Sequence, residues 1–200
     1  LAVRGVAKTP EGAVLTREGE LQKIRSWARS LSAAKLPRGA QDRVLQKALA
    51  ARVRALNDAD RFANKQIQSQ DGWLQVLSLQ TVANENRRLK EEILDLPAPK
   101  GLKSAEAKRY QALIAKQVAP FELKAAKIEG KTSKFWSSRP AEPFAKTLES
   151  SVGPKRAFLT REAQEMISVL ALLESSKGAS DAMKRLKEAV RSEPPEVRPG

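Results

Sequence analysis

The sequence predicts an all-helical protein, and its composition, periodicity and punctuation each support that prediction. Ala, Leu, Lys, Glu, Gln and Arg dominate the chain, whereas aromatic residues make up only 4% of it. The dominant residues lose little side-chain freedom in a helix. Apolar residues recur at intervals of three and four within segments that proline or glycine separates. We therefore expect seven or eight helices arranged as stacked hairpins, in the manner of a short α-solenoid.

The residue types that are missing exclude several classes of function. The chain contains no cysteine and no histidine. Disulfides, zinc sites built from thiolate or imidazole ligands, and catalysis by a Cys or His nucleophile are therefore excluded. The glycine patterns that cradle phosphates or dinucleotides are also missing. We expect a non-catalytic protein with no cofactor, no bound metal and no transmembrane segment, because no apolar run approaches roughly 18 residues.

The first 15 residues are expected to form a flexible lead-in. They contain Gly5, Pro10 and Gly12 without clear periodicity. The chain opens at Leu1 rather than at a methionine. We therefore expect a fragment or a processed product from which a targeting signal has been removed.

Two amphipathic helices are expected next. Thr16 is a candidate cap for a helix that runs to about residue 34. The apolar stripe of this helix consists of Leu21, Ile24, Ala28 and Leu31. Pro37-Arg38-Gly39 ends it, and a second helix is expected over about 40–67. The stripe of the second helix consists of Leu45, Leu49, Val53 and Leu56.

A third helix is expected from Trp73 to about Leu94, after a turn at Asp71-Gly72. Two overlapping apolar stripes cover this helix, so neighbours should pack on more than one of its sides. Their members are Trp73, Val76, Leu77 and Ala83 in one stripe and Leu79, Val82, Leu89 and Ile93 in the other. The charged run from Glu85 to Glu92 is expected to be exposed. Residues 16–96 thus form the N-terminal helical hairpins.

A proline-rich elbow at residues 97–102 separates these hairpins from the C-terminal helical region, residues 103–195. Its prolines lack the amide donor and hold the residues before them in extended geometry, so it is rigid. Ser104 begins the next helix. Pro120 either kinks that helix or starts a new one as a first-turn proline.

Apolar and basic residues segregate onto two helical faces between residues 121 and 138. The apolar face carries Phe121, Ala125, Ile128 and Phe135. The basic face carries Lys124, Lys127, Lys131 and Lys134. This lysine row is a candidate site for an anionic partner such as phosphate, lipopolysaccharide or an acidic protein. A solvated helix face is the alternative interpretation.

The last two helices are expected over about 160–176 and 179–191, before Pro194-Pro195 stops the chain. The second of them carries two small residues, Ala182 and Ala189, with the large apolar residue Leu186 between them, and Pro194 follows it. This pattern resembles the second helix of a tetratricopeptide repeat, and the hairpin at 163–194 is therefore tetratricopeptide-like. The aromatic positions of the repeat are missing, and its internal spacing is one residue short.

A longer segment, residues 73–136, carries a second resemblance. It contains Pro97-Ala98-Pro99-Lys100-Gly101-Leu102, then Tyr110, then Ala119-Pro120-Phe121-Glu122 and Lys124-Ala125. This order is similar to that of large tetratricopeptide-repeat envelope proteins of gliding and predatory Gram-negative bacteria. The resemblance implies a scaffold in the periplasm or at the outer membrane, with a cytoplasmic location left open. It supplies no catalytic residues.

The sequence therefore leaves two functional hypotheses. The first is a non-catalytic helical-repeat scaffold that mediates protein–protein interaction in the bacterial cell envelope. The alternative is a basic helical protein that binds nucleic acid, which the net charge of +14 favours. Aromatic residues interleaved with Lys and Arg, which nucleic-acid binding would predict, are not found. The tryptophans at positions 27, 73 and 136 are interpreted as structural anchors where helices cross.

Overall fold

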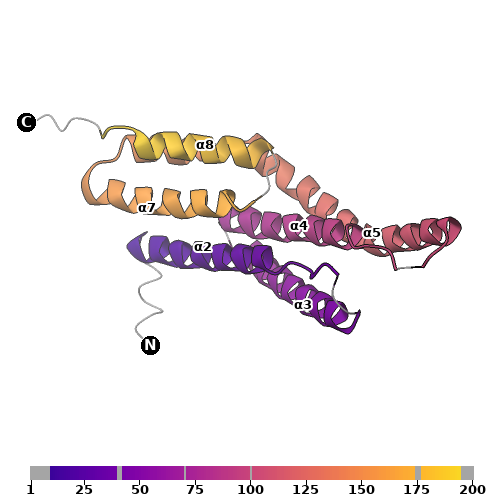
Figure 1. Cartoon of the computed structure of the whole chain (residues 1–200). Coiled ribbons are helices and arrows are strands. Elements are labelled where there is room, and N and C mark those ends of the chain that lie inside the picture. The colour runs from indigo at the N-terminus through magenta and orange to yellow at the C-terminus, as the bar shows by residue number, and fades with distance from the viewer. Residues whose placement is uncertain (1–9, 40–41, 70, 100, 174–176, 195–200) are drawn as a thin grey trace, which may run out of the picture.

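A computed structural model describes residues 10–39, 42–69, 71–99, 101–173 and 177–194 of this chain. Within these residues the protein consists of seven helices and no strand, which confirms the predicted all-helical class. They are α2 (Pro10–Ala33), α3 (Asp42–Ile67), α4 (Gly72–Leu94), α5 (Ser104–Ser137), α6 (Ala141–Glu149), α7 (Gly153–Leu170) and α8 (Lys177–Arg191). In Figure 1, α2, α4, α7 and α8 run along roughly the same direction.

Two predicted boundaries are wrong. α2 begins at Pro10 and not at Thr16, so residues 10–15 of the expected lead-in are helical. A proline is compatible with a first helical turn because the amide that it lacks has no helical acceptor there. Residues 1–9 lie outside the described part of the chain. α7 begins at Gly153, earlier than expected, because Pro154 occupies its first turn, and it ends at Leu170.

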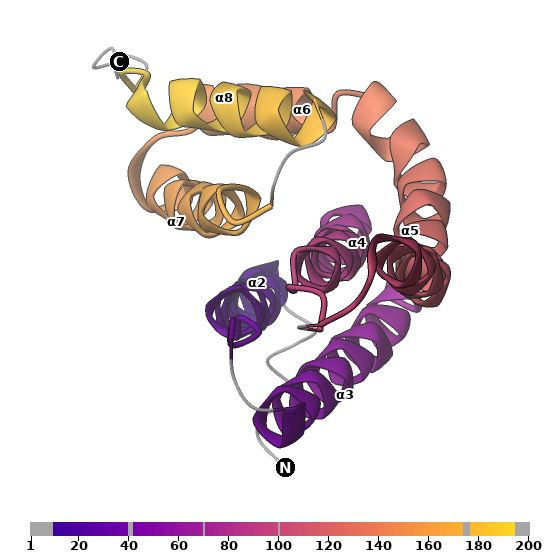
Figure 2. The same cartoon turned by 45° about the vertical axis from the view of Figure 1, so that its right-hand side comes forward.

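α4 is the central helix of the stack. It contacts α2, α3 and α5, and Figure 2 shows it enclosed by these three helices. Asp71 caps its first turn by accepting hydrogen bonds from the amides of Trp73 (3.0 Å) and Leu74 (3.2 Å), which confirms the turn predicted there. The members of both predicted stripes are buried except Leu79 and Ile93, which are half-buried.

Two large apolar clusters and a smaller one between α6, α7 and α8 hold the stack together. The first joins α2, α4, α7 and α8 and includes Leu21, Ile24, Leu77, Met166 and Leu186. The second joins α2, α3, α4 and α5 and includes Leu31, Leu56, Val82, Leu89 and Ile128. The predicted stripe of α2 is fully buried and contributes to both clusters. α2 and α4 therefore connect the two halves of the core.

The C-terminal helices form the predicted hairpin and extend it. α8 packs against both α6 and α7, and α7 packs against α2. Ala182, Leu186 and Ala189 of α8 are all buried, so the small residues do allow close approach of the paired helices. The helices differ in length from 9 residues in α6 to 34 in α5. The tetratricopeptide-like character of the hairpin stays a prediction.

Arg185 of α8 clamps α6 through two carboxylates. Its guanidinium donates to Glu142 (2.8 Å) and to both oxygens of Glu149 (2.6 and 2.9 Å). These hydrogen bonds lower the pKa of Glu142 and of Glu149 and raise the pKa of Arg185. The carboxylates therefore stabilise the fold above their ordinary pKa of about 4.3, and this contribution is lost as the pH falls through their lowered values.

We expect the variant Arg185→Gln to have a lower free energy of unfolding than the parent chain at neutral pH. Its free energy of unfolding should also change less than that of the parent when the pH is lowered. Urea unfolding at about pH 7 and about pH 3 measures the difference, which should narrow at the lower pH because the unfolded chain then protonates both carboxylates. An equal loss of stability at both pH values would contradict the clamp.

Three aromatic rings meet where α4, α5 and α8 cross. Trp73 lies with its ring centroid 5.3 Å from that of Phe135 and 6.1 Å from that of Trp136, in edge-to-face geometry. Phe135 and Trp136 make a third such pair at 5.2 Å. Trp73 and Trp136 are buried, which confirms them as anchors. Trp27 is only half-buried, against the second apolar cluster.

Gly178 of α8 allows the backbone to pass directly over Trp136. A Cβ atom at this position would lie 2.5 Å from the Cβ of Trp136 and 2.9 Å from its Cγ. These atoms belong to the stem of the side chain and cannot swing aside. Gly178→Ala should therefore destabilise the protein by about 1–3 kcal/mol, although alanine normally favours a helix.

The matched control is Gly19→Ala in α2, where nothing lies within 4 Å of the added Cβ. This variant should stabilise the protein by about 0.5–1 kcal/mol. Urea unfolding of both variants measures the contrast, and a stabilising effect of Gly178→Ala would contradict the close approach.

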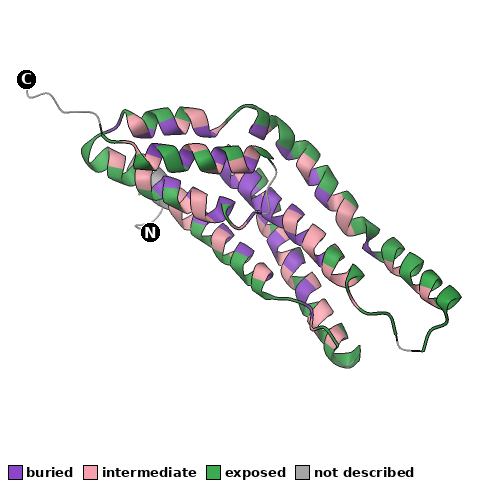
Figure 3. Ribbon diagram, turned by 45° about the horizontal axis from the view of Figure 1, so that its top comes forward, coloured by how far each residue is buried: buried purple, intermediate pink, exposed green. Residues whose placement is uncertain are grey.

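α5 is one continuous helix of 34 residues that includes Pro120. The proline removes one helical hydrogen bond, and the helix changes direction in Figure 1. The first half of α5 and the elbow before it project beyond the other helices, and Figure 3 shows this part as mostly exposed. We call residues 94–119 the arm. Of its helical residues in α5, only Val118 is buried.

Candidate interaction surface

The structure divides the predicted lysine row between two environments. Lys124 pairs with Asp60 of α3, at 2.9 Å between Nζ and a carboxylate oxygen. Lys127, Lys131 and Lys134 are exposed. Lys124 therefore helps to hold α5 against α3, and the other three lysines face solvent. The candidate face for an anionic partner thus keeps three of its four predicted members.

The acidic residues of α5 are directed towards its own neighbours. Glu122 accepts a hydrogen bond from Lys90 of α4 at 2.9 Å, and this bond lowers the pKa of Glu122. Glu129 receives both terminal nitrogens of Arg87, also on α4. Glu106 accepts from the amide of Lys103 (2.8 Å) and so caps the start of the helix. Between Arg109 and Lys134, the side of α5 opposite Glu122 and Glu129 therefore has no acidic side chain.

A continuous exposed stripe runs along that opposite side. Its members follow one another at steps of three or four residues, which is the spacing of one helical face. They are Arg109, Leu113, Lys116, Pro120, Leu123, Lys127, Lys131 and Lys134, and all of them are exposed. We call this set the outer stripe. Two large apolar side chains interrupt its basic residues, with Leu113 54% exposed and Leu123 70% exposed.

Sequence reasoning found only the C-terminal end of the outer stripe. It identified neither Leu113 nor Leu123 as an exposed residue. Extending the interval of three or four backwards from Lys127 would have found both leucines. The exposure of a leucine, however, depends on which neighbours pack nearby, and the sequence does not specify them.

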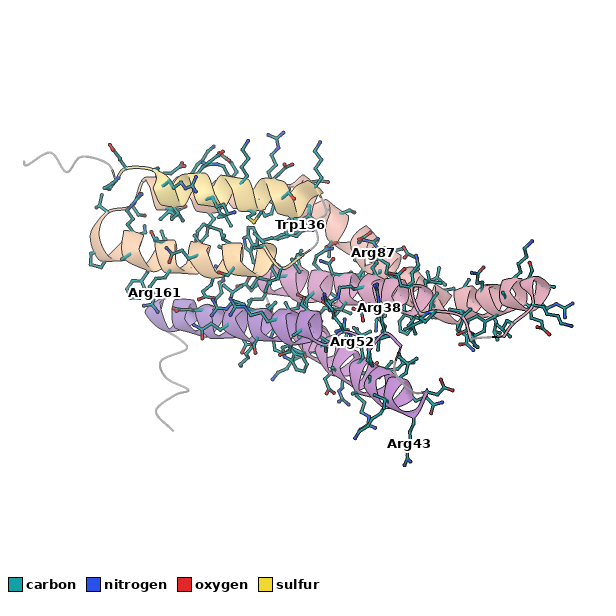
Figure 4. The ribbon with its side chains drawn as sticks, in the orientation of Figure 1. Arg38, Arg43, Arg52, Arg87, Trp136 and Arg161 are labelled. Atoms are coloured by element: carbon teal, nitrogen blue, oxygen red, sulfur yellow. The ribbon has the colours of Figure 1, made fainter. Side chains whose placement is uncertain are left out.

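α3 offers a useful comparison, because it too carries an exposed row at steps of three or four. This row contains Arg43, Lys47, Arg54 and Arg61, with Ala50 and Asn57 between them and Asn64 after them. Arg61 pairs with Asp58 of its own helix. In Figure 4, Arg43 points into solvent at the end of α3. The α3 row contains no large apolar residue and has the character of a solvated face.

Most of the charged run from Glu85 to Glu92 is buried or half-buried, contrary to the prediction, and only Glu91 in it is exposed. Glu85 is 5% exposed and pairs with Arg52 of α3, which is 3% exposed, at 2.8 Å. Arg52 also donates to the carbonyls of Leu31 and Ala34, the end of α2, and burial lowers its pKa. Arg88 donates to Glu85 (3.2 Å) and again to the end of α2.

The prediction was wrong because it assumed that a run of charged residues must face solvent. Here guanidinium groups replace the missing helical donors at the last turn of α2, and carboxylates of α4 neutralise them. Figure 4 shows Arg52 in the region where α2, α3 and α4 converge. This cluster of charges belongs to the core, and its carboxylates are committed to structural pairs.

The described residues contain no group of three or more acidic side chains able to hold a metal ion. In the same part of the chain, no helix combines the length and apolar character needed to cross a bilayer. Comparison with protein families, with curated proteins and with solved structures finds no match to this chain. The outer stripe is therefore the feature of the described structure from which we argue function.

Proposed function

We propose that this protein is a non-catalytic helical scaffold that binds an acidic protein partner along the outer stripe of α5. The observation that carries the proposal is an exposed helical face on which basic residues alternate with leucines and from which acidic residues are absent. Surface patches of this kind mark interaction sites more often than isolated apolar residues do. A partner helix with leucines flanked by glutamates has the complementary chemistry.

The two exposed leucines favour a protein partner over nucleic acid. Phosphate groups are bound by Lys and Arg, and bases stack on aromatic rings, so neither interaction uses a leucine. Leu113 and Leu123 lie within the basic row, where a helix packed on α5 would bury them. Nucleic-acid binding remains the second candidate because the chain carries a net charge of +14.

The compartment and the class of scaffold belong to the same proposal. The resemblance of residues 73–136 to tetratricopeptide-repeat envelope proteins supports a place in the periplasm or at the outer membrane. The pairing of α7 with α8 is compatible with a tetratricopeptide-like hairpin at one end of the stack.

The test uses a synthetic acidic peptide of about 20 residues, with leucine on one helical face and glutamate beside it. We expect the triple variant Lys127→Glu, Lys131→Glu and Lys134→Glu to bind this peptide at least about tenfold more weakly than the parent chain. Fluorescence anisotropy of the labelled peptide measures the affinity.

The matched control reverses three exposed charges on α3, as Arg43→Glu, Lys47→Glu and Arg54→Glu. It changes the net charge equally, and it should leave peptide affinity within about twofold of the parent. Equal losses in the two variants would show that binding depends on net charge alone and would contradict the proposed surface.

A second arm of the test uses a labelled DNA duplex at about 50 and about 200 mM salt. Tight duplex binding that falls steeply with salt would reject the scaffold in favour of the nucleic-acid alternative. The double variant Leu113→Ser and Leu123→Ser should weaken peptide binding and leave any duplex binding unchanged.

A further inference from the structure

An open apolar cavity lies in the arm, between the end of α4 and the first half of α5. Its volume is about 290 Å³. Ile93, Leu96 and Ala98 line one side, and Tyr110, Ile114 and Ala115 line the other. An apolar cavity of about 150 Å³ is enough to bind benzene. The arm cavity is therefore large enough for one aromatic side chain of a partner.

The backbone around the cavity is held in place before any partner binds. The prolines at 97 and 99 restrict the elbow, and Gly101 turns the chain with a φ of +90° that other residues rarely adopt. The hydrogen bond from the amide of Lys103 to Glu106 fixes the start of α5. A preformed cavity of this kind loses little entropy when it is filled.

The surface between the cavity and the outer stripe is smooth enough for a helix to lie on it. Six small residues lie along this side of α5 on either side of Glu122, which pairs with Lys90, and all six are exposed: Ala112, Ala115, Ala119, Ala126, Gly130 and Ser133. We call this row the small-residue flank. A Cβ atom added to Gly130 would meet nothing within 4 Å, so no part of the described structure covers the flank there. Small side chains let a second helix approach closely.

The basic and apolar side chains beside the small-residue flank indicate the chemistry of the partner that binds there. Arg109 and Lys116 of the outer stripe border it on one side, and Leu94 (45% exposed) lies beside the cavity on the other. A second copy of this chain would bring a net charge of +14 against the same basic face, which disfavours self-association. An acidic helix is attracted there.

We infer that the small-residue flank receives an acidic partner helix that places one aromatic side chain in the arm cavity and its glutamates against the outer stripe. This inference rests on the proposed function and adds to it the partner's class and its anchor. Interfaces commonly concentrate their binding energy in one such buried aromatic side chain.

The single tyrosine of the chain, Tyr110, lines the cavity and serves as the reporter. Protein labelled with 3-fluorotyrosine gives one fluorine resonance from this position. The labelled protein is titrated with a set of acidic peptides, each of which has a single phenylalanine at a different apolar position. Each peptide has a control peptide with alanine at the same position. At one position, phenylalanine should strengthen binding by about tenfold or more and shift the Tyr110 resonance.

The variant Ala115→Phe fills the cavity from its own wall and should abolish the advantage of the phenylalanine peptide. Ala51→Phe enlarges an exposed alanine of α3 and should preserve that advantage. If peptides with phenylalanine and with alanine bind equally and leave the Tyr110 resonance unchanged, the anchor is wrong and the scaffold proposal stands. If no peptide binds at all, both are overturned. The comparison of peptides on the parent chain decides the question even if Ala115→Phe fails to fold.

Discussion

Replacing Arg52 by methionine is expected to lower the free energy of unfolding by about 3–5 kcal/mol. The substitution leaves the carboxylate of Glu85 buried without the guanidinium that lies 2.8 Å from it. It also removes the donor to the carbonyls of Leu31 and Ala34 at the end of α2. Unsatisfied buried polar groups each cost about 1–3 kcal/mol, so the losses reinforce one another. Urea unfolding followed by circular dichroism measures the change.

Two controls separate the buried charge from the loss of a long side chain. Arg54→Met changes an exposed residue two positions away and should alter stability by no more than about 0.5 kcal/mol. The double variant Arg52→Met and Glu85→Leu removes both partners of the 2.8 Å pair together and should recover part of the lost stability, since the buried carboxylate that faced Arg52 is no longer present. A single Arg52→Met variant as stable as the parent would contradict the assigned role of the cluster.

Trp136→Ala should destabilise the protein by about 3–5 kcal/mol, the range found when a buried tryptophan is truncated to alanine. The substitution removes two edge-to-face ring contacts and opens a void beneath Gly178. Trp27→Ala is the matched control. Because Trp27 is half-buried, its truncation should cost clearly less. Both variants keep two tryptophans, so fluorescence reports unfolding in each.

Substitutions at positions 136 and 178 should be energetically coupled, and this coupling tests the close contact between α5 and α8. Gly178→Ala is destabilising only because Trp136 occupies the space of the new Cβ atom. The Trp136→Ala background keeps the Cβ atom that lies 2.5 Å from the new one, whereas Trp136→Gly removes it. In the Trp136→Gly background the space is free, and Gly178→Ala should become neutral or stabilising. A double-mutant cycle measures this reversal of sign. Additive effects of the two substitutions would mean that the helices do not meet at these residues.

The sequence predicted the helices well because their signal is local. Leu21, Ile24, Ala28 and Leu31 recur at helical spacing, and the structure buries all four. The path through Pro120 was left as two alternatives, because a proline is compatible both with a bend inside a helix and with a new first turn. The structure shows the first alternative, a single helix that continues through Pro120.

Contacts between distant segments were beyond the reach of sequence reasoning. Arg52 and Glu85 lie 33 positions apart, and neither has a local signal that marks it as buried. Lys124 has the same spacing as the other lysines of its row, yet a single carboxylate on α3 removes it from the free surface. Helical periodicity specifies which side chains share a face. The packing of whole helices then decides which faces are covered.

The arrangement of ion pairs also affects how quickly an anionic molecule finds this protein. Carboxylates such as Glu85, Glu129, Glu149 and Glu162 are engaged between helices, so the charges left over towards the solvent are predominantly positive. Each of these pairs is close to neutral, so the electrostatic field outside the molecule is set mainly by the net charge of +14. Such a field accelerates diffusional encounter and orients an incoming anion, and dissolved salt weakens it. Encounter rates with acidic molecules should accordingly vary with ionic strength much more than the stability of the folded chain does.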